Sequence, residues 1–158
     1  MITVVLPTHD SAARLVPVLT VLVPAAVDGL VKEVVFADAG STDATLAIAE
    51  DSGARVVQAP GDVGARLAAG CTAAKSAWIL ALGEDLVLPE GWRSLVEAHL
   101  AGGGGKPAWI AEAGLFGRPF AILASREAIE ATGGFKPGVD PLKVLLRRLK
   151  PGAVRLRV

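Results

Sequence analysis

The 158-residue chain lacks several features that would assign it to a broad class of protein. Its one cysteine excludes an internal disulfide framework and a cysteine-rich zinc site, and predicts a cytoplasmic location. Its 16 basic and 16 acidic residues balance, so there is no excess of positive charge for binding nucleic acid. The longest apolar stretch, Leu15–Val27, is shorter than the roughly 20 residues that span a membrane. With its two prolines it predicts a buried helix broken by proline, and peripheral contact with a membrane surface is the alternative.

The composition is that of a folded domain with a substantial core. Hydrophobic residues make up 52% of the chain and charged residues 20%, which excludes intrinsic disorder. The length corresponds to about one domain. We therefore expect residues 1–158 to form a single domain.

Short β-branched segments alternate with helical segments in the first half of the chain. The predicted strands are Ile2–Leu6, Glu33–Ala37, Ala54–Gln58 and Trp78–Leu82, and the predicted helices are Ser11–Val23, Asp43–Ser52 and Asp62–Lys75. This alternation predicts an α/β fold with a parallel sheet and right-handed crossovers.

The second half is less regular. It is predicted to contain helices at Pro89–Leu100, Arg126–Thr132 and Pro141–Lys150, and strands at Trp109–Ala113, Pro119–Ser125 and near Val154–Val158. Four consecutive glycines, Gly102–Gly105, predict a flexible connector between the halves.

Acidic residues follow two of the predicted strands directly. Asp38 follows the second strand, and Glu84 and Asp85 follow the fourth. Ligands of open α/β sheets bind at the carboxyl ends of the strands. There, one carboxylate can accept hydrogen bonds from a nucleoside and another can bind a hard cation. The alternative is that these acids only cap turns and face solvent.

Three sequence blocks give the chain a family resemblance. They read VVLPTHDSAARL at residues 4–15, FADAGSTDAT at 36–45 and ILALGEDLVLPEGW at 79–92, with a weaker fourth block, FAILASREAIEATGGF, at 120–135. The chain resembles the family 2 glycosyltransferases of GT-A fold, and is most similar to the small bacterial branch associated with radical-SAM and selenodomain proteins. The resemblance implies a Rossmann-like, mostly parallel sheet in three α/β/α layers. It also implies a nucleotide-sugar-binding half, residues 1–92, and a shortened acceptor and catalytic-base half, residues 107–158.

The resemblance implies a donor site for a nucleotide-diphosphate sugar, UDP- or GDP-linked. Asp38 takes the place of the acid that contacts the base in such enzymes. Pro7 and Thr8 would line the nucleotide cleft, and Arg66 matches a basic position that approaches the nucleotide.

The resemblance also implies a metal site and a catalytic base. Glu84 and Asp85 fall where the family's D-x-D motif binds Mn²⁺ or Mg²⁺ together with the donor diphosphate. Asp140 is the candidate base that deprotonates the acceptor, and Trp92 is the candidate for stacking on a sugar. The implied activity is metal-assisted, inverting sugar transfer of the hexosyltransferase type to an unknown acceptor.

Three positions depart from the family pattern. Gly83 replaces the first acid of D-x-D, Ala39 replaces the second acid of the base-binding block, and Val139 replaces the Glu of the Glu-Asp pair. These departures motivate an alternative, a catalytically degenerate nucleotide-sugar-binding or scaffold protein. A nucleotidyltransferase is a third hypothesis, but residues 7–15 lack the glycine-rich, basic phosphate loop that it requires.

Two further features have structural and functional interpretations. The basic run Arg147, Arg148 and Lys150 is either a solvated face or a binding site for donor phosphates or an anionic membrane surface. Cys71, among small residues in a predicted helix, is expected to be a buried, unreactive thiol.

Overall fold

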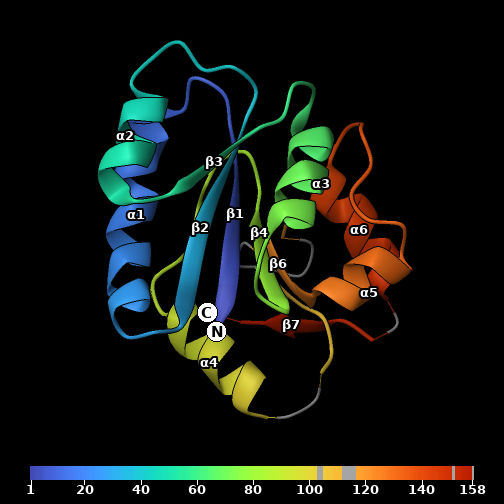
Figure 1. The fold of residues 1–158 in the computed structure, drawn as a ribbon. Helices are drawn as coiled ribbons and strands as arrows, with labels where there is room; N and C mark the ends of the chain where they lie inside the picture. Colours follow the sequence, from blue (N-terminus) through green and yellow to red (C-terminus); the bar gives the residue numbers. More distant parts are fainter. Residues whose placement is uncertain (103–104, 112–116, 151, 158) are drawn as a thin grey trace.

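The computed structural model describes residues 1–102, 105–111, 117–150 and 152–157. Within them the chain forms one seven-stranded sheet with helices on both faces (Figure 1). The elements in chain order are β1 (Ile2–Thr8), α1 (Ala12–Val27), β2 (Val31–Asp38), α2 (Thr45–Ser52), β3 (Arg55–Gln58), α3 (Val63–Ala73), β4 (Trp78–Leu82), α4 (Trp92–Ala101), β5 (Ala108–Ala111), β6 (Pro119–Ser125), α5 (Arg126–Ala131), α6 (Pro141–Leu149) and β7 (Val154–Leu156).

The predicted α/β fold with a mostly parallel sheet is confirmed. The strand order is β3-β2-β1-β4-β6-β5-β7. Strands β1 to β4 are parallel, β6 runs antiparallel to both β4 and β5, and β7 is parallel to β5. From β1, the chain adds β2 and then β3 on one side, and it then returns to add β4 on the other side of β1. This reversal between β1 and β4 is where an open α/β sheet binds ligands.

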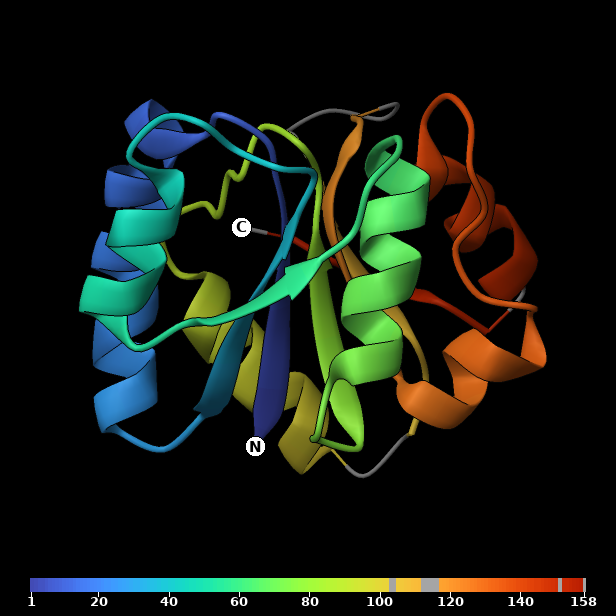
Figure 2. The ribbon, with the colours of Figure 1, turned by 45° about the horizontal axis from the view of Figure 1, so that its top comes forward.

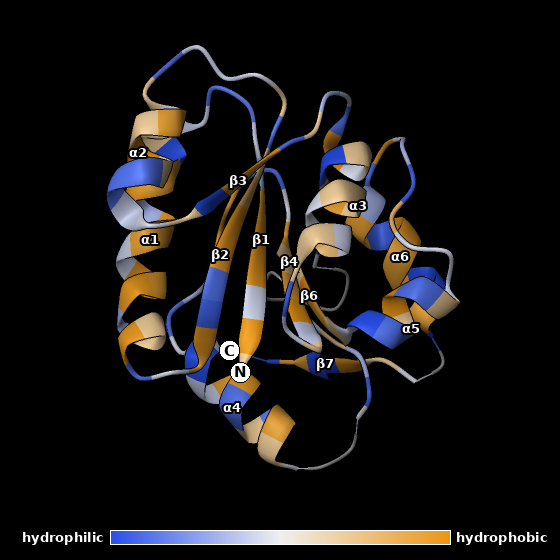
Figure 3. Ribbon diagram, in the orientation of Figure 1, coloured by the Kyte–Doolittle hydropathy of each residue, from blue (hydrophilic) through white to orange (hydrophobic). Residues whose placement is uncertain are grey.

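The helices form two layers around the sheet, as predicted. Helices α1, α2 and α4 pack on one face and α3, α5 and α6 on the other (Figure 2). The central strands are mostly hydrophobic apart from a hydrophilic stretch near the start of β2 (Figure 3), as expected for strands covered on both faces. Each face therefore has its own group of fully buried side chains.

The predicted helices and strands are present, with ends that differ by about one helical turn or less. Residues 112–113 and 158 of the predicted strands, and 103–104 of the glycine connector, lie outside the described residues.

The prediction of a helix broken by proline is wrong, because α1 continues through Pro17 and Pro24. Both prolines lie on the exposed side of the helix, where water can reach the carbonyl groups that lose an N–H partner. Leu15, Val18 and Leu22 form the opposite, buried side. In the described part of the chain no helix is long and apolar enough to cross a membrane.

Two glycines allow α3 to pack closely against its neighbours. A Cβ atom on Gly70 would lie 2.4 Å from Cγ1 of Val5, and one on Gly64 would lie 2.0 Å from the carbonyl oxygen of Lys136. Alanine favours an isolated helix over glycine by about 1 kcal/mol. At Gly70 the contact with β1 reverses this preference.

We expect Gly70→Ala to lower the free energy of unfolding by about 1–3 kcal/mol, because the added methyl group overpacks the core. Urea unfolding followed by circular dichroism measures the change. The control is Gly102→Ala at the end of α4, where the backbone is already helical and an added Cβ makes only ordinary contacts. Equal stability of the two variants would contradict the proposed close packing.

Candidate functional site

The carboxyl ends of β1 and β4 lie side by side at the reversal point of the sheet. Among the described residues, three non-glycine residues have positive φ: Asp10 (44°), Leu86 (53°) and Asp140 (56°). Asp10 follows β1, Leu86 follows β4, and Asp140 lines the same pocket as Leu86. Such strained conformations gather at functional sites. This edge of the sheet is therefore the candidate site.

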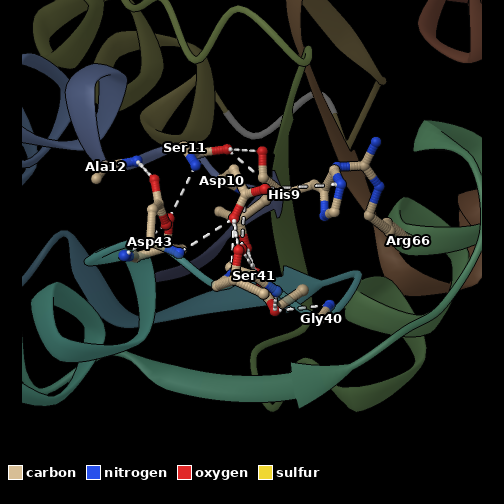
Figure 4. Close-up of polar contacts among 12 residues, drawn as sticks. His9, Asp10, Ser11, Ala12, Gly40, Ser41, Asp43 and Arg66 are labelled. Carbon is tan, nitrogen blue, oxygen red and sulfur yellow. Dashed lines mark hydrogen bonds and ion pairs between the residues drawn. The ribbon is translucent and has the colours of Figure 1, made fainter.

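Hydrogen bonds join the loop after β2, which belongs to the block at residues 36–45, to the loop after β1 (Figure 4). The Asp10 carboxylate accepts hydrogen bonds from the backbone N–H groups of Thr42 (2.7 Å) and Asp43 (3.2 Å). In return, the Asp10 N–H donates to the Ser41 hydroxyl at 2.8 Å. The bonds from Thr42 and Asp43 are the main cause of an Asp10 pKa below its usual value. The two loops therefore form one rigid unit.

Asp43 adds a cap for two helices to this unit. Its carboxylate accepts from the N–H of Ala12, at the start of α1, at 3.0 Å, and from the N–H of Thr45, at the start of α2, at 2.9 Å. The Thr45 hydroxyl in turn accepts from the N–H of Ser11 at 2.8 Å. Capping orphan N–H groups stabilises both helix starts.

Asp38, the last residue of β2, lies at the centre of these contacts and has no exposed surface. One carboxylate oxygen accepts from the hydroxyls of Thr8 (2.8 Å) and Ser41 (2.5 Å), and the other from the N–H groups of Gly40 (2.9 Å) and Ser41 (2.8 Å). Burial acts to raise the pKa of Asp38, but these hydrogen bonds outweigh it and hold the pKa below its usual value.

These contacts correct the predicted roles of the last residues of β1 and β2. The Asp38 carboxylate supports the loop and is fully engaged, so it has no free oxygen for a nucleotide base. Pro7 and Thr8 are also buried, so their side chains do not line an open cleft. The sequence motif marks the right edge of the sheet but overstates the accessibility of these side chains.

Arg66 reaches the same edge from α3 and is only 5% exposed. Its guanidinium pairs with the half-exposed Glu84 carboxylate at 3.2 Å, while its Nε atom is buried without a hydrogen-bond partner. The side chain is turned toward His9 (Figure 4). A buried guanidinium with an unused donor is costly unless an anion satisfies it. This environment suits the predicted contact of Arg66 with a nucleotide.

The loop after β4 is held from both faces of the sheet. Arg14 of α1 donates to the carbonyl oxygen of Glu84 at 3.0 Å, and Arg66 of α3 pairs with the carboxylate of the same residue. The loop that carries Glu84 and Asp85 is therefore positioned by two arginines, one from each helical layer.

A pocket of about 390 Å³ opens beside this loop. The charged residues that line it are Asp62, Glu84, Asp85, Arg118 and Asp140. Asp140 begins α6 but makes no capping bond, and its carboxylate pairs with Arg118 at 3.1 Å. The pocket thus brings together the predicted metal-binding acids and the predicted base.

Sequence reasoning missed Asp62 and Arg118 as residues of this pocket. Asp62 caps α3 by accepting from the N–H of Ala65 at 2.9 Å, and also accepts from the N–H of Gly138 at 2.7 Å. These two bonds lower the pKa of Asp62. Its place before α3 predicts the cap, but its contact with the loop before α6 depends on tertiary packing. No sequence pattern marks Arg118.

Residues 3–104 match the family model described as glycosyl transferase family 2. The chain belongs to glycosyltransferase family 2. No curated protein matches it.

Solved structures support the same family. The chain is similar to glucosyl-3-phosphoglycerate synthase from Mycobacterium tuberculosis, with 28% identity and a TM-score of 0.74 over all of this chain and 72% of that one. The complex of that enzyme with uridine diphosphate gives 27% identity, a TM-score of 0.74 and 70% coverage of its chain. Its complex with Mn²⁺, uridine diphosphate and glucosyl-3-phosphoglycerate gives 26%, 0.72 and 70%. The predicted family, GT-A fold and enzyme class are confirmed.

The structure accounts for two positions singled out in the sequence, Trp92 and Gly83. The ring of Trp92 is 3% exposed and packs in the core, so the prediction that it stacks on a sugar is wrong. A Cβ atom on Gly83, at the missing acid of D-x-D, would lie 3.1 Å from Cδ1 of Leu142. The side of Gly83 that a family acid would occupy therefore faces α6.

The donor atoms for a metal are few in this family 2 chain. Within the described residues no three His, Cys, Asp or Glu side chains cluster as a metal site. Glu84 and Asp85 nevertheless line one pocket, and two carboxylates plus substrate phosphates are a common way to bind Mg²⁺. The residues fit an ion that is shared with a bound diphosphate.

Proposed function

We propose that the protein transfers a sugar from a UDP- or GDP-linked donor to an acceptor hydroxyl, with inversion at the anomeric carbon. One observation carries the proposal: Glu84 and Asp85 share a single pocket with Asp140 at the reversal point of the sheet, next to the buried Arg66. Similar structures of glucosyl-3-phosphoglycerate synthase, whose complexes contain Mn²⁺ and phosphoglyceric acid with uridine diphosphate or uridine-diphosphate-glucose, support it.

The donor side is formed by the first half of the chain, residues 1–92. Arg66 would bind the donor phosphates, and Glu84, now paired with Arg66, would exchange that partner for the metal ion. Asp85 would hold the same ion. A bound Mn²⁺ or Mg²⁺ would neutralise charge that develops on the diphosphate leaving group.

The acceptor side is formed by the second half, residues 107–158. Asp140 would accept the proton of the acceptor hydroxyl while the acceptor oxygen forms a bond to the anomeric carbon. The bond from that carbon to the diphosphate oxygen breaks, and the nucleoside diphosphate leaves with the electron pair. Arg118, paired with Asp140, would keep the carboxylate oriented.

The motif blocks support placement in the small bacterial branch associated with radical-SAM and selenodomain proteins. The cytoplasmic location inferred from the single cysteine belongs to the same proposal. Cys71 itself takes no part in the chemistry, because burial raises its pKa to about 12.

Calorimetric titration with UDP and with GDP, each with and without Mn²⁺, tests the donor site. We expect Mn²⁺-dependent binding of one nucleotide, weakened at least about 10-fold by Asp85→Asn, because losing even a residue that only supports a metal ligand costs about 10- to 100-fold in metal affinity. Asp51→Asn, an exposed acid on α2, is the matched control and should bind like the wild type.

Absence of binding to both nucleotides would rule out the proposed transferase. Nucleotide affinity that does not depend on Mn²⁺ and is unchanged in Asp85→Asn would favour the alternative, a degenerate nucleotide-sugar-binding protein. The absence of an acid at Gly83 is the argument for that alternative.

A further inference from the structure

We propose that the acceptor carries a phosphate or carboxylate group, which binds in a second pocket between α6 and β5. This inference rests on the proposed transfer reaction, because it assigns the acceptor of that reaction. The pocket has a volume of about 280 Å³, and Arg118, Pro119 and Asp140 line both it and the first pocket. A ligand in the second pocket would therefore lie beside the carboxylate proposed as the base.

The second pocket contains an excess of positive charge. Lys143 and Arg147 of α6 and Lys150 just after it line one side, and Trp109 of β5 lines another. Asp140 is the one carboxylate among the described lining residues, and it pairs with Arg118. The three cations along α6 thus have no acidic partner in the pocket.

Two of these cations, Lys143 and Arg147, differ from the neighbouring Arg148 in their contacts. Arg148, on another side of α6, donates to the carbonyl oxygens of Thr132 (3.1 Å) and Gly134 (2.9 Å) and so fastens α6 to α5. Lys143 and Arg147 are exposed and make no hydrogen bond or ion pair within the part of the chain that the structure describes. Arg148 therefore has a structural role in holding α6 against α5, whereas no contact among the described residues gives Lys143 or Arg147 such a role.

The walls of the pocket make it a site for a small molecule. Lys150 Nζ lies 5.8 Å from the centre of the Trp109 ring, and Leu146 and Pro119 add apolar surface. Like charges that line a concave, partly apolar surface repel one another and concentrate anions there. A flat lipid surface could contact exposed lysines, but it could not enter a pocket that ends at Asp140.

This arrangement predicts the form of the acceptor. Its anionic group would lie against Lys143, Arg147 and Lys150, and its reacting hydroxyl would lie at the Asp140 end. The acceptor is thus a small hydroxylated phosphate or carboxylate, and a neutral analogue should be a poor one.

Titration with inorganic phosphate, followed by the indole N–H resonance of Trp109 in ¹H–¹⁵N spectra, tests the pocket. We expect a saturable shift whose apparent affinity falls at least tenfold in Lys143→Gln/Arg147→Gln. The control, Lys32→Gln/Lys106→Gln, removes two exposed charges outside both pockets and should bind phosphate as the wild type does. Mn²⁺-dependent nucleotide binding should be unchanged in both double variants.

Several results would overturn the inference. If phosphate binding is unchanged in Lys143→Gln/Arg147→Gln, or is weakened equally in the control variant, the second pocket is not the phosphate-binding site. Loss of nucleotide binding in that variant would assign the cations to the donor. Sedimentation with phosphatidylserine vesicles that depends on Lys143 and Arg147, without a phosphate-induced shift of Trp109, would assign them to a membrane surface.

The same measurements separate this inference from the proposed function. If the wild type binds neither UDP nor GDP but phosphate still shifts Trp109 and requires Lys143 and Arg147, the transferase proposal fails and the anion pocket stands. If nucleotide binds and phosphate does not, only the acceptor assignment fails.

Discussion

Asp140→Asn is expected to lower the rate of sugar transfer about 100- to 10,000-fold, the usual effect of losing a general base. The amide cannot take the proton of the acceptor hydroxyl. Asn is also the substitution that disturbs the backbone least, because Asp140 has φ of 56° and Asn tolerates the left-handed region nearly as well as Asp. The fold and the donor site should therefore remain intact.

Release of nucleoside diphosphate in the presence of a small hydroxylated phosphate measures the rate. Affinity for nucleotide and Mn²⁺, measured by calorimetry, should stay close to that of the wild type, because Asp140 is proposed to act on the acceptor and not on the donor. Asp51→Asn again serves as the matched control. A transfer rate in Asp140→Asn equal to that of the wild type would exclude this carboxylate as the base.

Asp38→Ala is expected to lower the free energy of unfolding by about 3–5 kcal/mol, because four donors, three of them in buried hydrogen bonds, lose their acceptor at once. Asp38→Asn should cost less. Its carbonyl oxygen can still accept from the N–H groups of Gly40 and Ser41, and its amide can donate to the Thr8 and Ser41 hydroxyls. Urea unfolding at neutral pH compares the two variants with the wild type.

The pH dependence gives an independent check on Asp38. Its pKa is lowered from the ordinary value of 3.8 in the folded state, so the ionised carboxylate contributes stability at pH values above 3.8. That contribution is lost as the pH falls below 3.8 through the folded-state value. The stability gap between wild type and Asp38→Asn should therefore narrow on acidification. A constant gap, or a gap below about 1 kcal/mol with Asp38→Ala, would contradict a buried, ionised Asp38.

The fold could be predicted well because its signals are local. Alternation of short β-branched strands with helices predicts that β1 to β4 run parallel, and the strand-end acids identify the edge of the sheet that contains the pocket. Trp92 shows how a local signal can be overlooked. It shares helical spacing with Val96, and both are buried, so the periodicity of α4 already indicated a core position.

The accessibility of the site could not be predicted, because it depends on which donors converge on each carboxylate. The sequence places Asp38 and Asp85 after strands in the same way. In the structure, both carboxylate oxygens of Asp38 accept hydrogen bonds from neighbouring residues, four in all, whereas Asp85 lines an open pocket. Arg118 and Asp62 enter the pocket through packing between segments that are far apart in the chain.

The hydrogen bond from the Gly138 N–H to the Asp62 carboxylate affects which substitutions in the second half can leave Asp140 in place. The start of α3 holds the loop before Asp140, and Gly64 lies directly against the backbone of Lys136 in the same loop. The position of Asp140, the proposed base, is thus set in part by contacts with residues 62–64 in the first half of the chain. Substitutions elsewhere in the second half would therefore leave Asp140 in place, as long as Gly138 and Lys136 keep their contacts with the start of α3.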